Sequence, residues 1–122
     1  MKLSEIKEVL NAAVFVGHEQ LDMQVKGGAA SDLMSDLLRL PREGAVLLTG
    51  LTSIQVIRTS VISGMVAVVF VRGKRPDPEM IAHAREHDLP LLSSPLNMYT
   101  SCGMLFSKGL KSIREDRNRE AD

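Results

Sequence analysis

The sequence of 122 residues contains no tryptophan, and aromatic residues make up only 3% of it. Without more aromatic rings, the chain offers no platform on which unpaired bases could stack. It also lacks an excess of positive charge, because 15 Lys and Arg residues balance 15 Asp and Glu residues. Proteins that bind nucleic acid electrostatically usually carry a basic surplus. We therefore expect no nucleic-acid partner.

Cysteine is nearly absent, and the single Cys102 excludes an internal disulfide. It lies in an apolar segment, so we expect a small buried thiol. No apolar run approaches the length of about eighteen residues that suggests a membrane span, and the N-terminal segment has no signal-peptide core. These absences predict a cytoplasmic protein with no membrane partner.

Hydrophobic residues account for 44% of the chain and charged residues for 25%. This balance is typical of a folded globular protein, and the length suits one domain with one core. We expect the domain to span residues 1–110. A charged C-terminal tail at 111–122, either a solvated helical extension or disordered, would follow it.

Five helices are predicted where apolar residues recur at helical spacing after a capping residue. The first lies at about residues 4–11, and the second lies in the segment 30–40 and ends at Pro41. The apolar faces of the second and third helices are predicted to be Leu33, Met34, Leu37 and Leu38, and Ile54, Ile57, Val61 and Ile62. The expected caps are Ser4, Ser31 or Asp32, Thr52 in a capping box with Gln55, Asp77 before Pro78, and Ser94 before Pro95.

Short apolar runs of strand length alternate with these helices. We expect a buried strand that ends at Gly17, a short strand at 23–25 followed by a break at 26–28, central strands at 45–49 and 67–71, and a last strand within 89–94. This alternation predicts an α/β fold: a single domain with a mostly parallel or mixed sheet and helices packed on its faces.

Three breaks in the pattern each follow a strand and lead into a helix. Because the carboxyl ends of parallel strands meet at one edge, these loops should gather there, where helix N-termini present free N–H groups. This edge is the predicted ligand site. Its residues are Gly50, Leu51, Thr52, Arg72, Gly73, Lys74, Ser93 and Ser94.

Other chemical groupings are weaker. Asp32 and Asp36 are spaced to share a helix face and could hold a cation, but a helix-dipole role for Asp32 and an Asp36–Arg39 pair explain them better. His83 and His87 have the i, i+4 spacing of some metal ligands, yet a surface pair is the better interpretation. We expect no metal site.

No assembled catalytic machinery is recognisable. Tyr99, Ser101 and Cys102 suggest a nucleophile, but no histidine lies near them in sequence and there is no G-x-S-x-G elbow. Residues 71–78 lack the phosphate-loop pattern, because Lys74 is followed by Arg75 rather than Ser or Thr. We expect a protein that is not an enzyme, and no particular cofactor is indicated.

Three segments, 30–38, 47–57 and 68–94, resemble the DRTGG domain, and the resemblance extends over about residues 2–110. Gly50-Leu51-Thr52 stands where that family has Gly-Asp-Arg, and Val71-Arg72-Gly73 stands where it has Thr-Gly-Gly. DRTGG domains occur as small bacterial proteins and within CBS-containing pyrophosphatases, and their fold is similar to the N-terminal domain of HPr kinase/phosphorylase. The resemblance implies a regulatory or associating module that is often dimeric.

The leading hypothesis is thus a regulatory module that forms a homodimer and senses a small anionic metabolite or nucleotide at the strand-end loops. The alternative is an interaction subunit without a small ligand, which uses apolar helix faces for a protein partner. A third hypothesis is a small enzyme that uses Asp32, Asp36 or Tyr99. The side chains that would form the interaction surface are Met34, Met98, Met104 and Phe106.

Overall fold

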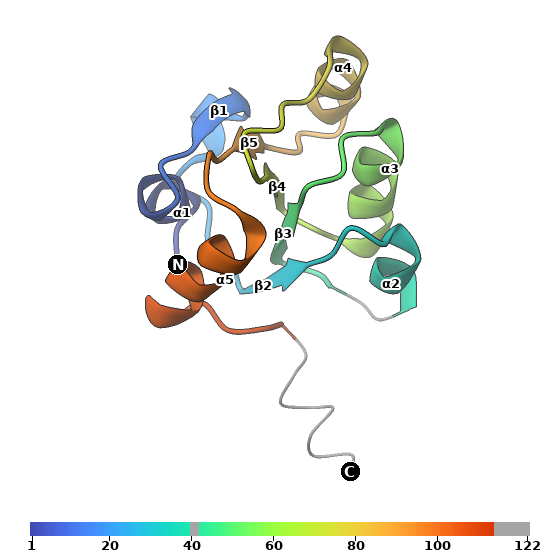
Figure 1. Ribbon diagram of the computed structural model, residues 1–122. Helices are drawn as coiled ribbons and strands as arrows, with labels where there is room; N and C mark the ends of the chain where they lie inside the picture. The colour runs from blue at the N-terminus through green and yellow to red at the C-terminus, as the bar shows by residue number, and fades with distance from the viewer. Residues whose placement is uncertain (40–41, 114–122) are drawn as a thin grey trace.

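A mixed five-stranded sheet forms the centre of the molecule in a computed structural model of the chain (Figure 1). The structure describes residues 1–39 and 42–113. Within them the strand order is β1-β5-β4-β3-β2; β2 to β5 are parallel, and β1 is antiparallel to β5. The predicted α/β class is confirmed. The elements are α1 (Leu3–Val9), β1 (Ala13–Val16), the 3-10 turn η1 (His18–Gln20), β2 (Gly27–Ala30), α2 (Met34–Arg39), β3 (Ala45–Thr49), α3 (Ile54–Ser63), β4 (Ala67–Phe70), α4 (Pro78–Glu86), β5 (Leu91–Ser93) and α5 (Met98–Ser107).

Helices cover both faces of the sheet. α1 and α5 lie on one face, and α2, α3 and α4 lie on the other (Figure 1). The side chains of β3 alternate between the two layers: Val46 and Leu48 pack beneath α1 and α5, whereas Leu47 packs beneath α2, α3 and α4. Every residue of β3 and β4 is buried, which explains their continuous apolar runs.

The first helix begins earlier than predicted. Its N-cap is Lys2 rather than Ser4, and Glu5 accepts a hydrogen bond from the Lys2 N–H at 2.9 Å. Strand β1 lies where it was expected, but it is half-exposed rather than buried. The reason is its position at the edge of the sheet, where only β5 flanks it.

The second strand was misplaced by the sequence prediction. Residues 23–25 contribute only an isolated bridge between Lys2 and Gln24, and the predicted break at 26–28 contains the start of β2 at Gly27. Gly27 serves close packing, because a Cβ there would lie 3.0 Å from Ile113. The Gly28 N–H donates to the Lys111 carbonyl at 2.8 Å. Residues 111–113 therefore run beside β2, and the rest of the predicted tail lies outside the described residues.

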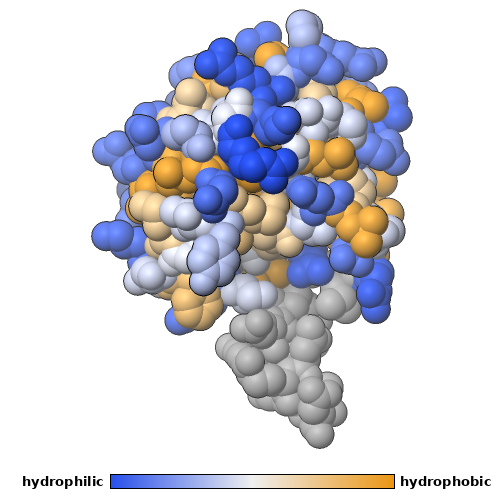
Figure 2. Space-filling view, viewed as in Figure 1, coloured by the Kyte–Doolittle hydropathy of each residue, from blue (hydrophilic) through white to orange (hydrophobic). Residues whose placement is uncertain are grey.

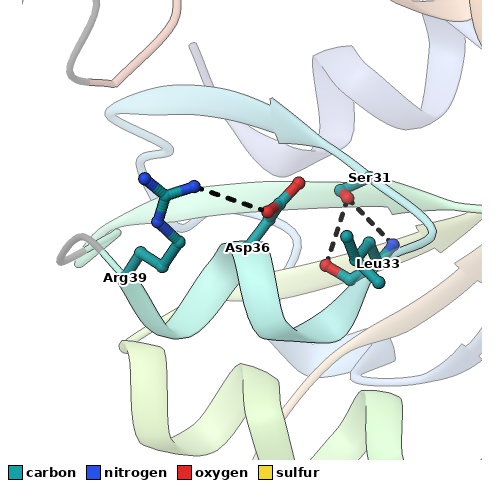
Figure 3. Close-up of polar contacts among 4 residues, drawn as sticks. All are labelled: Ser31, Leu33, Asp36 and Arg39. Atoms are coloured by element: carbon teal, nitrogen blue, oxygen red, sulfur yellow. Dashed lines mark hydrogen bonds and ion pairs between the residues drawn. The ribbon is translucent and has the colours of Figure 1, made fainter.

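Helix α2 also differs from its prediction. It begins at Met34, after a turn in which the Ser31 hydroxyl accepts a hydrogen bond from the Leu33 N–H and donates to the Leu33 carbonyl (Figure 3). Leu37 is buried, but Leu38 is 55% exposed, because a helix this short turns only part of its surface to the sheet. Leu33, in the turn before the helix, is 58% exposed. Its predicted end at Pro41 lies outside the described residues.

The other helix starts were predicted with mixed success. The Asp77 carboxylate accepts from the Met80 N–H at 2.9 Å, which confirms the cap of α4. The predicted cap of α5 at Ser94 is wrong, because Asn97 holds that place and bonds the Thr100 N–H at 2.8 Å.

Helix α3 forms around the predicted apolar stripe, but its buried face is rotated. Val56 and Ile57 are buried together with Thr59 and Ser60, whereas Val61 is 38% and Ile62 is 75% exposed. The predicted stripe therefore lies partly on the surface. In Figure 2, hydrophobic surface is visible on the α2–α3 side of the molecule, among hydrophilic residues.

Candidate functional site

Three loops meet at the carboxyl edge of the parallel strands, as the sequence predicts. Thr49 of β3 is in register with Phe70 of β4, which is in register with Ser93 of β5. The loops beyond are joined by their backbones, since the Gly73 N–H donates to the Ser94 carbonyl at 2.8 Å. The structure therefore brings together the loops that contain Gly50–Thr52, Arg72–Lys74 and Ser93–Ser94.

Asp32 joins this edge from the segment that follows β2. One carboxylate oxygen accepts from the Gly50 N–H at 2.7 Å and from the Thr49 hydroxyl at 3.0 Å. The Gly50 hydrogen bond, then the Thr49 bond and the charge of Arg72, hold the pKa of Asp32 below its ordinary value of 3.8, against the opposing effect of partial burial. The predicted helix-capping role of Asp32 is thus wrong.

Arg72 lies directly over Gly50. A Cβ at Gly50 would lie 2.6 Å from one guanidinium nitrogen of Arg72 and 3.0 Å from its Cζ. Glycine is needed there so that the guanidinium can approach the backbone this closely. Arg72 itself has φ 57°, a left-handed conformation that is costly for a residue with a side chain, and Gly73 follows with φ 70°.

The two predicted serines hold the loops in place. Ser93 donates its hydroxyl to the Lys74 carbonyl, and Ser94 donates its own to the Leu10 carbonyl at 2.7 Å. Both serines are buried. Their hydroxyls link β5 to the β4–α4 loop and to the end of α1, so they help to position the edge.

The N-terminus of α3 is an open helix end at this edge. Its N-cap is Ser53, whose side chain makes no capping hydrogen bond, so the predicted capping box of Thr52 and Gln55 is wrong. Thr52 is exposed, and its hydroxyl has no hydrogen-bond partner in the described part of the chain. The start of α4, by contrast, is already occupied by the Asp77 carboxylate. An anion would therefore meet free N–H groups at α3.

Positive charge gathers beside this opening. Arg72, Lys74 and Arg75 are all exposed, and they follow one another after β4. The backbone N–H groups of Arg72 and Lys74 are committed, to the Leu96 carbonyl at 2.8 Å and the Val71 carbonyl at 3.1 Å. Attraction for an anion at this loop must come from the side chains.

The weaker candidates remain separate from the edge. Asp36 lies 3.9 Å from the Arg39 guanidinium, which confirms the predicted pair (Figure 3). Asp32 precedes α2 and turns to Gly50, so it does not share a helix face with Asp36.

The two C-terminal histidines form a pair on α4 and the residue after it. Their ring centroids are 5.2 Å apart, and His87 Nδ1 lies 3.0 Å from the His83 carbonyl oxygen. No group of three or more His, Cys, Asp or Glu side chains suited to a metal ion occurs within residues 1–39 and 42–113.

The candidate nucleophiles of α5 differ in their exposure to solvent. Tyr99 is 91% exposed, whereas Ser101 is fully buried. Cys102 is half-buried instead of fully buried, and burial raises the pKa of its thiol, which disfavours the reactive thiolate.

No helix in the described ranges is long and apolar enough to cross a membrane. A scan against models of protein families finds no match, and a search of curated proteins also finds none. A search of solved structures finds similarity to the CBS and DRTGG domains of the regulatory region of Clostridium perfringens pyrophosphatase, complexed with the activator diadenosine tetraphosphate. The TM-score is 0.73 at 15% sequence identity, with 85% of this chain and 45% of that chain covered. The chain thus spans under half of that solved chain and shares the fold of the part that it covers.

Proposed function

We propose that the chain is a non-enzymatic regulatory module that binds an anionic ligand, a nucleotide or phosphorylated metabolite, at the carboxyl edge of its sheet. The observation that carries the proposal is the guanidinium of Arg72 held over Gly50 at an edge where the N-terminus of α3 is open. Gly50, Leu51, Thr52, Arg72, Gly73 and Lys74 form the binding surface, and Ser93 and Ser94 support it.

The chemistry of this edge suits a phosphate. Arg72 can hold two oxygens with one guanidinium, Lys74 adds a second charge, and the first turn of α3 supplies N–H donors. The negative charge of Asp32 interacts electrostatically with Arg72. A carboxylate beside an arginine also suits a ligand that carries hydroxyl groups as well as phosphates, as a ribose phosphate does.

The structural neighbour supports the ligand class. That protein is the regulatory region of a pyrophosphatase, and its activator is a nucleotide. A module of the same fold with a basic carboxyl edge is a suitable receptor for a related polyanion.

The experiment is a thermal-shift and calorimetric titration of the full chain with diadenosine tetraphosphate, ATP and inorganic pyrophosphate. A ligand that binds only the folded state must raise the melting temperature. Replacing Arg72 and Lys74 together by alanine should abolish the shift and change the unliganded stability by no more than about 1 kcal/mol.

The matched control is the double variant Arg85→Ala with Lys108→Ala. It removes the same charge near the far ends of α4 and α5, where both residues are exposed. It should keep the ligand shift. Equal losses in both double variants would indicate attraction to net charge and would contradict a site at Arg72, as would unchanged binding after Arg72 and Lys74 are replaced.

Self-association is a second role, favoured by exposed apolar side chains. Leu33 and Leu38 near and on α2 and Ile62 on α3 are all more than half exposed, as is Phe106 on α5. Met104 is 37% exposed, and Met34 and Met98 are partly buried. Such surface is typical of contacts between copies of a chain. We expect a homodimer by light scattering at micromolar concentration, and a clean monomer mass would contradict this role.

A further inference from the structure

A second concave feature lies on the α5 side of the sheet, where β2, α5 and residues 110–112 meet. It is a pocket of about 280 Å³ that shares no residue with the proposed anion site. Gly28 and Ala30 line it from β2, and Cys102 lines it from α5. The apolar side chains around it are Leu48, Leu105, Phe106 and Leu110.

Two cationic side chains border this apolar pocket. The Arg42 Nε atom is buried and has no hydrogen-bond partner among the described residues. The Lys111 ammonium lies 4.1 Å from the centre of the Phe106 ring, which places a second positive charge beside the pocket. Arg42 as a whole is only partly buried and, like Lys111, lines the pocket, so the two positive charges attract an anionic oxygen there.

The shape and chemistry together define the class of ligand. Pockets for drug-sized molecules begin at roughly 300 Å³, so this one suits a smaller molecule. Its apolar walls favour a short aliphatic chain, and its Arg42 favours a carboxylate at the end of that chain. A free phosphate would satisfy the cations but would leave the apolar walls without a partner.

We propose that this pocket binds a small aliphatic carboxylate, with its chain against Leu48, Leu105 and Phe106 and its carboxylate paired with Arg42. The site is independent of the nucleotide site proposed above. It also offers its own reporter, because Cys102 is the only cysteine of the chain and lines the pocket.

The test measures how hexanoate affects the melting temperature of the full chain and the rate at which Cys102 reacts with a thiol-specific dye. Hexanoate should raise the melting temperature and slow the labelling several-fold. Hexanol lacks the charge and acetate lacks the chain, so each should act only at much higher concentration. Equal potency of hexanol, acetate or inorganic phosphate would overturn the proposal.

Two variants separate the contribution of the positive charge to hexanoate binding from that of the cavity. Arg42→Gln removes the cation and should lower the affinity for hexanoate on the order of 10- to 100-fold, as the loss of a charged hydrogen bond does. Ala30→Leu should fill the pocket and abolish the effect with Arg42 in place. Arg39→Gln, at an exposed arginine outside the pocket, is the control and should bind as the natural chain does. Hexanoate binding that survives both Arg42→Gln and Ala30→Leu would overturn the assignment.

Discussion

Arg72 combines a costly backbone conformation with an exposed side chain that lies against Gly50. Left-handed backbone costs a residue with a side chain roughly 1–3 kcal/mol, and glycine would avoid that cost. The arginine side chain is nevertheless placed over Gly50 and within electrostatic reach of Asp32. Strain retained beside a convergence of polar groups is typical of a binding site.

The first prediction separates stability from binding at this residue. Arg72→Gly should leave the free energy of unfolding unchanged or raise it by up to about 1 kcal/mol, because the strain is relieved. It should lose the melting-temperature shift caused by the nucleotide. Asp88→Gly is the control, since Asp88 also has a positive φ, of 52°, and lies after α4 away from the edge. That variant should keep the shift, and a loss of the shift in both would contradict the role of Arg72.

The second prediction concerns Gly50. In Gly50→Ala the new methyl group would lie 2.6 Å from the Arg72 guanidinium, which must move aside. Because the flexible end of a side chain yields, the unfolding free energy should fall by no more than about 1 kcal/mol. Ligand affinity, measured by calorimetry, should drop. A Cβ at Gly103 would meet no atom within 4 Å. The control Gly103→Ala should therefore keep the ligand affinity and stabilise α5 by about 0.5–1 kcal/mol.

The third prediction follows from the lowered pKa of Asp32. A carboxylate whose pKa is lower in the folded state stabilises the fold above its ordinary value of 3.8, and this contribution is lost as the pH falls through the lowered pKa. Denaturant unfolding should therefore show a shallower acid loss of stability in Asp32→Asn than in the natural chain, with parallel profiles near neutral pH. Identical acid slopes would contradict this assignment.

At the scale of the element, α3 and α4, two of the helices that begin at the carboxyl edge, differ in their caps. Helix α4 has the Asp77 carboxylate on the Met80 N–H, whereas α3 begins at Ser53 without a side-chain bond. A capped helix end has fewer N–H groups left for an anion, so α3 is the better receptor.

The fourth prediction tests this difference. Asp77→Ala should lower the free energy of unfolding by about 1 kcal/mol, the usual cost of a lost cap. Ser53→Ala should lower the free energy of unfolding by only a few tenths of a kcal/mol, because no capping hydrogen bond is removed. Chemical denaturation of the two variants measures both values. A larger loss in Ser53→Ala would show that its hydroxyl caps α3 in solution.

Sequence reasoning succeeded where one element carries its own signal. The buried runs of β3 and β4 and the Asp77-Pro78 start of α4 were predicted because apolar length and capping chemistry are local. Strand β2 was missed because Gly-Gly-Ala-Ala has no strand-forming side chains, and its structure depends on contacts with β3 and Ile113. Without β2, no sequence argument could bring Asp32 to Gly50. The edge was predictable, whereas the carboxylate within it was not.

At the scale of the whole molecule, the fifth prediction is the absence of ATP hydrolysis and of protein-kinase activity. The lysine after β4 is followed by arginine, without the hydroxyl residue and acidic metal ligand that phosphoryl transfer needs. A coupled assay on repurified protein should give no rate above the blank. Turnover that persists through repurification and disappears in Asp32→Asn would contradict this prediction and revive an enzymatic role.

The edge strand β1 has a consequence for the order in which the chain assembles. Its partner in the sheet is β5, about 80 residues later, and α1 packs beside α5. During synthesis on the ribosome, residues 13–16 therefore have no sheet partner until residue 93 has emerged. The parallel core of β2, β3 and β4 is complete before then. Strand β1 is therefore synthesised before the core strands but pairs after them, and its apolar residues are exposed to other nascent chains in the meantime.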